Sequence, residues 1–140
     1  MKVLCVERDK ARLRQMRKEA RELVPDAQIT VCRDPSRAEK LTREKGCDVL
    51  LTNTVFDGSN WGGMILARKI QSVCPRANII FIADRADTTA AYDAWQIGAS
   101  AFLLRPYEKQ RLARAFADPR FAAVCNNMST RPRSADQIDA

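Results

Sequence analysis

The feature that most constrains the fold of this chain is a fivefold alternation of a short apolar run with a segment of helical periodicity. The apolar runs are residues 3–6, 28–32, 48–52, 78–82 and 101–104. Each run is too short to be a buried helix and is bounded by turn residues, which favours strands covered on both faces. Right-handed crossovers then leave few topologies. The pattern predicts a single three-layer α/β domain, with a five-stranded parallel sheet and five helices.

Capping and breaking residues set the predicted helix boundaries. Leu13, Met16, Ala20 and Leu23 recur at helical spacing in the first helix. Asp34 and Pro35 are types favoured at an N-cap and at the first helical position. A polar loop is predicted at 54–61 and a last helix at 107–116. The other residues that begin or end helices are Pro25, Gly46, Gly62, Gly63, Pro75, Asp87 and Gly98.

The length of 140 residues corresponds to one domain, which we place at residues 1–117. Asp118 and Pro119 indicate one further helical turn, and the polar composition from Asn126 onward predicts a disordered tail within 118–140. The first apolar run is too short for a signal peptide, and no stretch approaches a membrane span. We therefore expect a cytoplasmic protein with no membrane partner.

The chain contains no histidine and five cysteines. The absence of histidine excludes Ser-His-Asp and Cys-His catalysis within one chain, histidine-bearing zinc sites and a phosphohistidine. The cysteines are odd in number and form no CxxC pair, so we expect reduced thiols that serve as small hydrophobic residues. A redox role for Cys125 is the alternative.

The formal net charge is +7, and much of it lies in the first helix. Seven basic residues stand against three acidic ones between Arg8 and Glu22. This segment is either a solvated helix face or a docking surface for an acidic protein or a nucleic acid.

The residues at the ends of the predicted strands form a more specific pattern. The first strand is followed by Glu7-Arg8-Asp9, and the third ends at Asn53; the fourth ends at Ala83, and the fifth leads into Arg105-Pro106-Tyr107. In order and spacing these segments, with the turn from Gly98 to Phe102, resemble the receiver domain of two-component response regulators. The resemblance covers about residues 1–117 and implies the flavodoxin-like strand order 2-1-3-4-5.

The resemblance also implies what the strand ends have lost. In an active receiver two acids and a phosphoacceptor aspartate hold Mg²⁺ through oxygen ligands. Here Arg8 places a cation in that site, and Asn53 occupies the phosphoacceptor position with an amide that is not a nucleophile. Ala83 lacks the family hydroxyl, and Arg105 replaces the family lysine. We interpret Glu7, Arg8, Asn53, Ala83 and Arg105 as a degenerate phosphorylation pocket with no catalytic residue, metal or cofactor.

Clustered carboxylates without a metal would repel one another. We therefore predict that Arg8 and Arg105 pair with Glu7 and Asn53 in a self-satisfied polar cluster. Two alternatives stay open. Asp57 is a possible non-standard phosphoacceptor, and Asp9 is either a substitute carboxylate or a helix N-cap.

Further expectations come from the same resemblance. It implies a cis Arg105–Pro106 bond. It also places Phe102 at the position of the family's switch residue, an aromatic side chain that changes rotamer; the alternative is that Phe102 is a static hydrophobic residue. Family members dimerise or contact effectors through the fourth helix, fifth strand and fifth helix. Tyr92, Trp95 and Tyr107 lie there and are our interface candidates, although Trp95 is as consistent with a core position. Trp61 is a further surface aromatic beside the pocket.

We thus expect a pseudo-receiver that is not an enzyme. It would act by phosphorylation-independent binding to a kinase, another regulator or a second copy of itself, as a homodimer, in the control of transcription or of a kinase pathway. One alternative is a nucleic-acid-binding regulator that uses the basic first helix. An enzyme of flavodoxin-like fold is a weaker one, because no glycine-rich phosphate loop is present.

Overall fold

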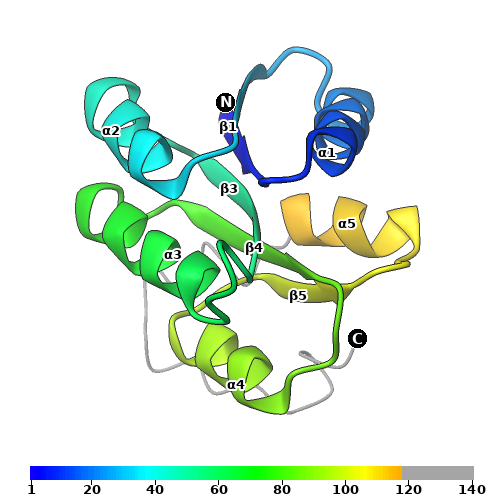
Figure 1. Ribbon diagram of the computed structural model, residues 1–140. Helices are drawn as coiled ribbons and strands as arrows, with labels where there is room; N and C mark the ends of the chain where they lie inside the picture. The colour runs from blue at the N-terminus through cyan, green and yellow to red at the C-terminus, as the bar shows by residue number, and fades with distance from the viewer. Residues whose placement is uncertain (118–140) are drawn as a thin grey trace.

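The computed structural model describes residues 1–117 of the chain, in which five strands and five helices alternate (Figure 1). The predicted boundaries at 118–140 lie outside the described residues, as does Cys125. In chain order the elements are β1 (Lys2–Val6), α1 (Lys10–Leu23), β2 (Gln28–Cys32), α2 (Pro35–Lys45), β3 (Val49–Asn53), α3 (Gly62–Val73), β4 (Asn78–Ala83), α4 (Thr88–Gln96), β5 (Ala101–Leu104) and α5 (Lys109–Phe116).

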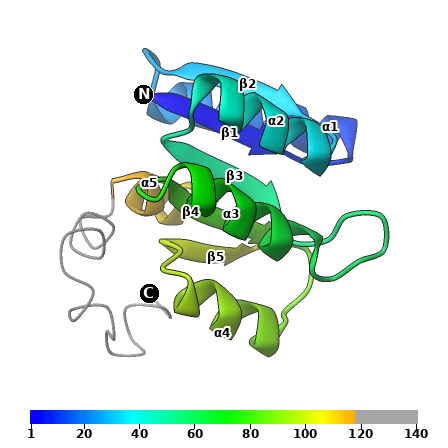
Figure 2. The ribbon, with the colours of Figure 1, turned by 90° about the vertical axis from the view of Figure 1, so that its left-hand side faces the viewer.

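The strands form one parallel sheet in the order β2-β1-β3-β4-β5, which confirms the predicted flavodoxin-like architecture. Helices α1 and α5 cover one face, and α2, α3 and α4 cover the other (Figures 1 and 2). Strands β3 and β4 lie in the middle and are buried along their whole length. Strand β2 is at one edge of the sheet and β5 is at the other.

The core consists of two apolar layers, one on each face of the sheet. Side chains of successive strand residues point to opposite faces. Leu51 therefore packs with Met16 of α1 and Leu112 of α5, whereas Leu50 packs with Ile70 of α3 and Ala94 of α4. Burial on both faces explains why the strands read as continuous apolar runs.

Three helices begin at the predicted type of cap. The carboxylates of Asp9, Asp34 and Asp87 accept hydrogen bonds from backbone N–H groups in the first turns of α1, α2 and α4. The hydrogen bond from Arg12 N–H holds the pKa of Asp9 below its ordinary value. Asp9 is thus the helix cap rather than a second carboxylate of the pocket.

Several boundaries differ from the predicted runs by one or two residues. Strand β1 begins at Lys2, β4 ends at Ala83, and β3 spans Val49–Asn53 because Asn53 pairs with Ile82 of β4. Helix α5 begins at Lys109, two residues after the predicted start, with Glu108 as its N-cap residue. The chain before it includes a cis Arg105–Pro106 bond, as the resemblance implied.

The four cysteines among the described residues are free thiols. Burial raises the pKa of Cys5 and of Cys47 to about 12, which suits small hydrophobic side chains better than reactive thiols. Among the helices described, none is long and apolar enough to cross a membrane.

Candidate functional site

The carboxyl ends of β1, β3, β4 and β5 bring four of the five pocket residues together. The Asn53 amide donates from Nδ2 to Oε1 of Glu7 at 2.6 Å. Nη2 of Arg105 lies 3.4 Å from the same oxygen. The backbone N–H of Arg105 donates to the carbonyl of Ala83 at 2.8 Å, which holds the two strand ends in register.

Glu7 is the centre of this cluster, and the residue is only 3% exposed. Besides the two donors on Oε1, its Oε2 accepts the backbone N–H of Asp9 at 3.0 Å. The other end of the Asn53 amide is also used, since Oδ1 accepts the N–H of Val55 at 3.0 Å. Both buried polar side chains are thus satisfied by protein groups, as a stable interior requires.

Arg105 links this buried cluster to an outer carboxylate, Asp84. Its Nη1 lies 3.1 Å from Oδ1 of Asp84, and Arg12 of α1 binds the other oxygen of the same carboxylate. Burial alone would raise the pKa of Asp84, but the hydrogen bond and charge of Arg105, with the charge of Arg12, hold this pKa below its ordinary value. Sequence reasoning missed Asp84 and Arg12, although Asp84 directly follows a strand end, where such residues were sought.

Arg8 lies elsewhere, which corrects the prediction that it pairs with Glu7 and Asn53. Its Nη2 binds Oδ2 of Asp57 at 2.7 Å, and both side chains are exposed, at 42% and 71%. Successive residues at a strand end point in opposite directions, so when Glu7 turns into the pocket, Arg8 turns out of it. The expected self-satisfied cluster therefore contains Arg105 but not Arg8.

Asp57 meets Arg8 because of a tight turn in the β3–α3 loop. Phe56 and Ser59 exchange two backbone hydrogen bonds across Asp57 and Gly58, whose φ values are 52° and 80°. Two positive φ angles at an Asp-Gly pair are typical of a two-residue hairpin turn. The turn carries the Asp57 carboxylate into solvent, away from the buried cluster.

A glycine fixes how α3 starts beside this cluster. A Cβ at Gly63 would lie 2.2 Å from the carbonyl oxygen of Asn53 and 2.8 Å from Cα of Thr54. The backbone N–H of Gly63 also donates to the carbonyl of Thr54 at 2.9 Å. Only glycine permits such a close approach of the helix to the end of β3.

The strand-end residues do not fit a divalent cation. Within residues 1–117 no three acidic or cysteine side chains lie close enough together to form a metal site. Glu7, whose carboxylate is the one buried among residues 1–117, already accepts three hydrogen bonds from Asn53, Arg105 and Asp9. A hard cation needs several free oxygen ligands, which this set does not supply.

The aromatic candidates have different environments. Phe102 packs partly buried against the α2–α4 side of the core, with its ring centroid 6.3 Å from that of Phe81. Tyr107 is also turned inward, and its hydroxyl donates to Glu19 of α1 at 2.5 Å. Burial, and then Glu19, raise the pKa of Tyr107. Tyr107 therefore joins the β5–α5 connection to α1 and is not a surface anchor.

Tyr92 and Trp95 remain on the α4 side of the molecule. Tyr92 is 57% exposed, and its ring centroid lies 6.0 Å from that of Trp95, which is half-buried. On the neighbouring strand β5, Leu104 is 40% exposed. Trp61 is equally open, at 49%, but it lies at the start of α3.

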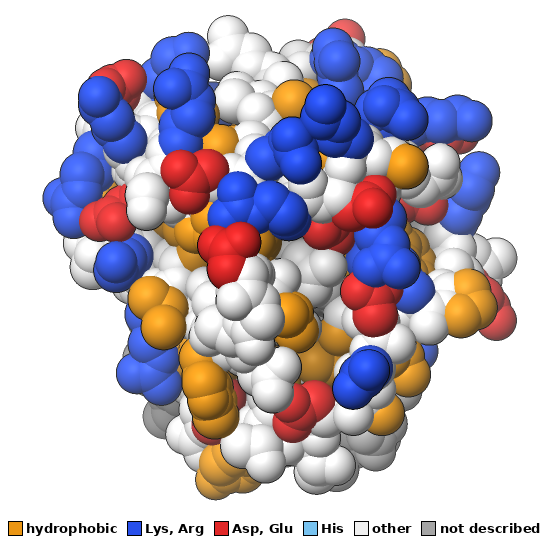
Figure 3. Space-filling view, in the orientation of Figure 1, with side chains coloured by type: hydrophobic (Ala, Val, Ile, Leu, Met, Phe, Trp, Pro, Cys, Tyr) orange, Lys and Arg blue, Asp and Glu red, His pale blue; other side chains and the backbone are white. Residues whose placement is uncertain are grey.

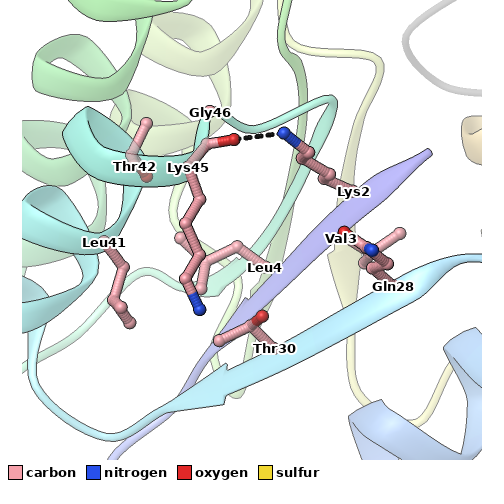
Figure 4. A pocket seen from close by; sticks show the side chains of 9 residues that line it. All are labelled: Lys2, Val3, Leu4, Gln28, Thr30, Leu41, Thr42, Lys45 and Gly46. Carbon is pink, nitrogen blue, oxygen red and sulfur yellow. Dashed lines mark hydrogen bonds between the residues drawn. The ribbon is translucent and has the colours of Figure 1, made fainter.

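A small hollow lies at the opposite, amino-terminal edge of the sheet (Figure 4). Its volume is about 30 Å³, between β1, β2 and the end of α2, and the Lys2 ammonium donates to the carbonyl of Lys45 at 2.5 Å beside it. A space of this size holds water but no organic ligand.

The chain matches the family model of the response regulator receiver domain over residues 3–117. A comparison with curated proteins gives no match. Solved structures share its fold. A response regulator receiver domain protein from Clostridium thermocellum is 18% identical, with a TM-score of 0.71 over 91% of this chain and 96% of that one. The receiver domain of a DNA-binding response regulator from Colwellia psychrerythraea is 20% identical, with a TM-score of 0.71 over 84% and 95%. The N-terminal domain of an uncharacterized Wolinella succinogenes protein is 21% identical, with a TM-score of 0.72 over 91% and 99%.

Proposed function

Because the chain belongs to the response regulator receiver domain family, we propose that it is a pseudo-receiver, a signalling module that binds protein partners without being phosphorylated. It is not an enzyme under this proposal, and it takes no metal or phosphoryl group. Its output is the control of transcription or of a kinase pathway through the partner that it binds.

The observation that supports this proposal most is the hydrogen bond of 2.6 Å from Asn53 to Glu7. An active receiver needs a carboxylate nucleophile at the end of β3 and free acidic ligands beside it. Here the end of β3 holds the Asn53 amide, which donates to Glu7. Arg105 is the third residue of this cluster and carries a permanent positive charge. The charges that Mg²⁺ would neutralise are already neutralised by the side chains of the chain itself.

The partner surface that we propose is the α4–β5–α5 face. It presents exposed Tyr92 and Leu104 beside the half-buried Trp95. Aromatic residues with a large contact area are typical anchors of protein interfaces. The inward position of Tyr107 leaves Tyr92 as the principal aromatic anchor of this face.

Mass spectrometry tests the loss of phosphorylation. We expect no phosphate adduct on the intact chain after incubation with Mg²⁺ and acetyl phosphate, while a receiver that retains its aspartate, treated in parallel, gains one. An adduct would contradict the proposal. The Asp57→Asn variant then identifies the site, because loss of the adduct would assign phosphorylation to the exposed Asp57.

A pair of matched variants tests the binding surface. Tyr92 and Trp61 are similarly exposed aromatic residues on different faces, at 57% and 49%. We expect Tyr92→Arg, and not Trp61→Arg, to weaken self-association in light scattering or capture of a partner in pull-downs. Equal effects of the two changes would contradict the assignment of this face.

A further inference from the structure

A groove of about 270 Å³ runs between α1 and the edge strand β2. It is on the far side of α1 from α5, away from the α4–β5–α5 face (Figure 1). Leu13 and Val31 provide its apolar surface, and Val31 is 38% exposed. Four cations line it together with these two residues: Lys10, Arg14, Arg17 and Arg33.

Among the described residues, the cations of the groove have no acidic partner. No carboxylate lines the groove, and Lys10, Arg14 and Arg17 form no ion pair with any residue of 1–117. The acidic residues of α1 interact on the side of the helix that faces α5, where Glu19 accepts a hydrogen bond from Tyr107 and Glu22 pairs with Lys109. Lys and Arg side chains gather over α1 and α2 in the upper half of Figure 3, in contrast to the lower half. The groove therefore carries an uncompensated positive charge.

Within residues 1–117, no strand pairs with the outer edge of β2. The N–H of Gln28 and the carbonyl of Cys32 bond toward β1, to Met1 and Glu7. Because hydrogen-bonding groups alternate along a strand, those of Ile29 and Val31 point away from β1 and out of the sheet. An exposed edge of this kind is a template for an added strand.

We propose that this groove binds an extended acidic peptide of a partner protein, which pairs with β2 as a sixth strand. Alternate side chains of a strand are about 6.6 Å apart. The helical positions 10, 14 and 17 are separated by about 6 Å and about 4.5 Å along α1; the long Lys and Arg side chains span the difference, so acidic side chains at every second peptide residue reach successive cations. The peptide backbone satisfies the edge of β2, and the charges select an acidic sequence.

Charge and shape distinguish this partner from two others. A second copy that docks groove to groove about a two-fold axis would bring the same four cations against each other, which is repulsive. A single-stranded nucleic acid binds on aromatic stacking surfaces as well as on cations, and no aromatic residue lines the groove. The proposal does not depend on whether the strand-end cluster is phosphorylated.

The test is a fluorescence anisotropy titration of the full 140-residue chain with a labelled eight-residue peptide of alternating Glu and Val. We expect saturable binding that weakens with salt. The Arg14→Glu/Arg17→Glu variant should bind on the order of tenfold more weakly. The Arg37→Glu/Lys40→Glu variant makes the same change of charge on the exposed face of α2 and should change affinity less than about twofold. Circular dichroism checks that both variants fold.

Two further measurements separate strand addition from simple charge attraction. N-methylation of alternate peptide amides should weaken binding on the order of tenfold, because it removes the ladder hydrogen bonds. The bound peptide should protect the amides of Ile29 and Val31 from hydrogen exchange. The proposal is overturned if N-methylation has no effect, if both charge-reversed variants bind equally weakly, or if oligothymidine binds more tightly than the peptide.

Discussion

Replacing Asn53 with aspartate is the most informative single change in this molecule. The amide of Asn53 lies 2.6 Å from Oε1 of Glu7, and both residues are buried, at 4% and 3% exposure. Asn53→Asp removes the donor and introduces a second carboxylate at this distance. The size of the resulting penalty follows from two routes by which the variant can accommodate the change.

In the first route both carboxylates stay ionised. Two like charges about 4 Å apart repel by about 4 kcal/mol at an effective dielectric constant of 20. In the second route the introduced carboxyl keeps its proton, which costs about 1.36 kcal/mol for each pH unit above its ordinary pKa of about 3.9, or about 4 kcal/mol at pH 7. Arg105, 3.4 Å from Glu7, offsets part of the cost of the first route. We expect a loss of about 2–4 kcal/mol of unfolding free energy at pH 7.

The penalty should depend on pH in a defined direction. The neighbouring acid raises the pKa of the introduced carboxyl in the folded state above its unfolded value, so the folded state retains the proton longer. The variant then loses stability as pH rises from about 4 toward that raised pKa, by up to about 1.36 kcal/mol per pH unit. Below about pH 4 the protonated carboxyl can donate to Glu7 as the amide does, and the penalty should vanish.

Urea unfolding followed by circular dichroism between pH 4 and pH 8 measures this effect. Asn60→Asp makes the same chemical change at an exposed loop residue and is the matched control. Equal stabilities of the two variants, or a pH-independent loss for Asn53→Asp, would show that Asn53 and Glu7 are not in contact.

Three other predictions test separate parts of the structure. Tyr107→Phe should lower the free energy of unfolding in urea by about 1–2 kcal/mol because it removes the hydrogen bond to Glu19. Because the pKa of Tyr107 is raised in the folded state, the wild type should lose stability above about pH 10, and the variant should not share that loss. Gly63→Ala should destabilise by at least about 1–3 kcal/mol, because the added methyl overlaps backbone at the end of β3; a gain of stability, as for an unconstrained helical glycine, would contradict the close approach. Cys5 and Cys47, with pKa values raised to about 12, should resist iodoacetamide at pH 8 until denaturant is added, as read by peptide mass.

The sequence predicted the fold well because its signals are local and agree with one another. The bounds of β2 and β5 follow from apolar runs between turn residues, and the caps of α1, α2 and α4 are aspartates. The displacement of α5 was not predictable from periodicity, because Tyr107 fits the helical pattern although α5 begins only at Lys109.

The candidate site was predictable only in part. Strand order alone brings Glu7, Asn53 and Arg105 to one edge, so their proximity follows from topology. The partner of Arg8 does not, because it depends on the backbone angles of the Asp57–Gly58 turn, which no periodic pattern encodes. The role of Asp84 was not predictable from its position after β4, because it depends on the side chains of Arg12 and Arg105 reaching the same carboxylate.

The contact of Asp84 with both Arg12 and Arg105 has a consequence for how information would pass through this protein. One carboxylate fastens the β4–α4 connection to α1 and to the end of β5 at once. Under the proposed function, no phosphorylation event breaks the ion pairs of Asp84 with Arg12 and Arg105. If the domain signals without phosphorylation, as proposed, the strength of its signal follows the number of copies present, and the timing of the response follows their synthesis and degradation.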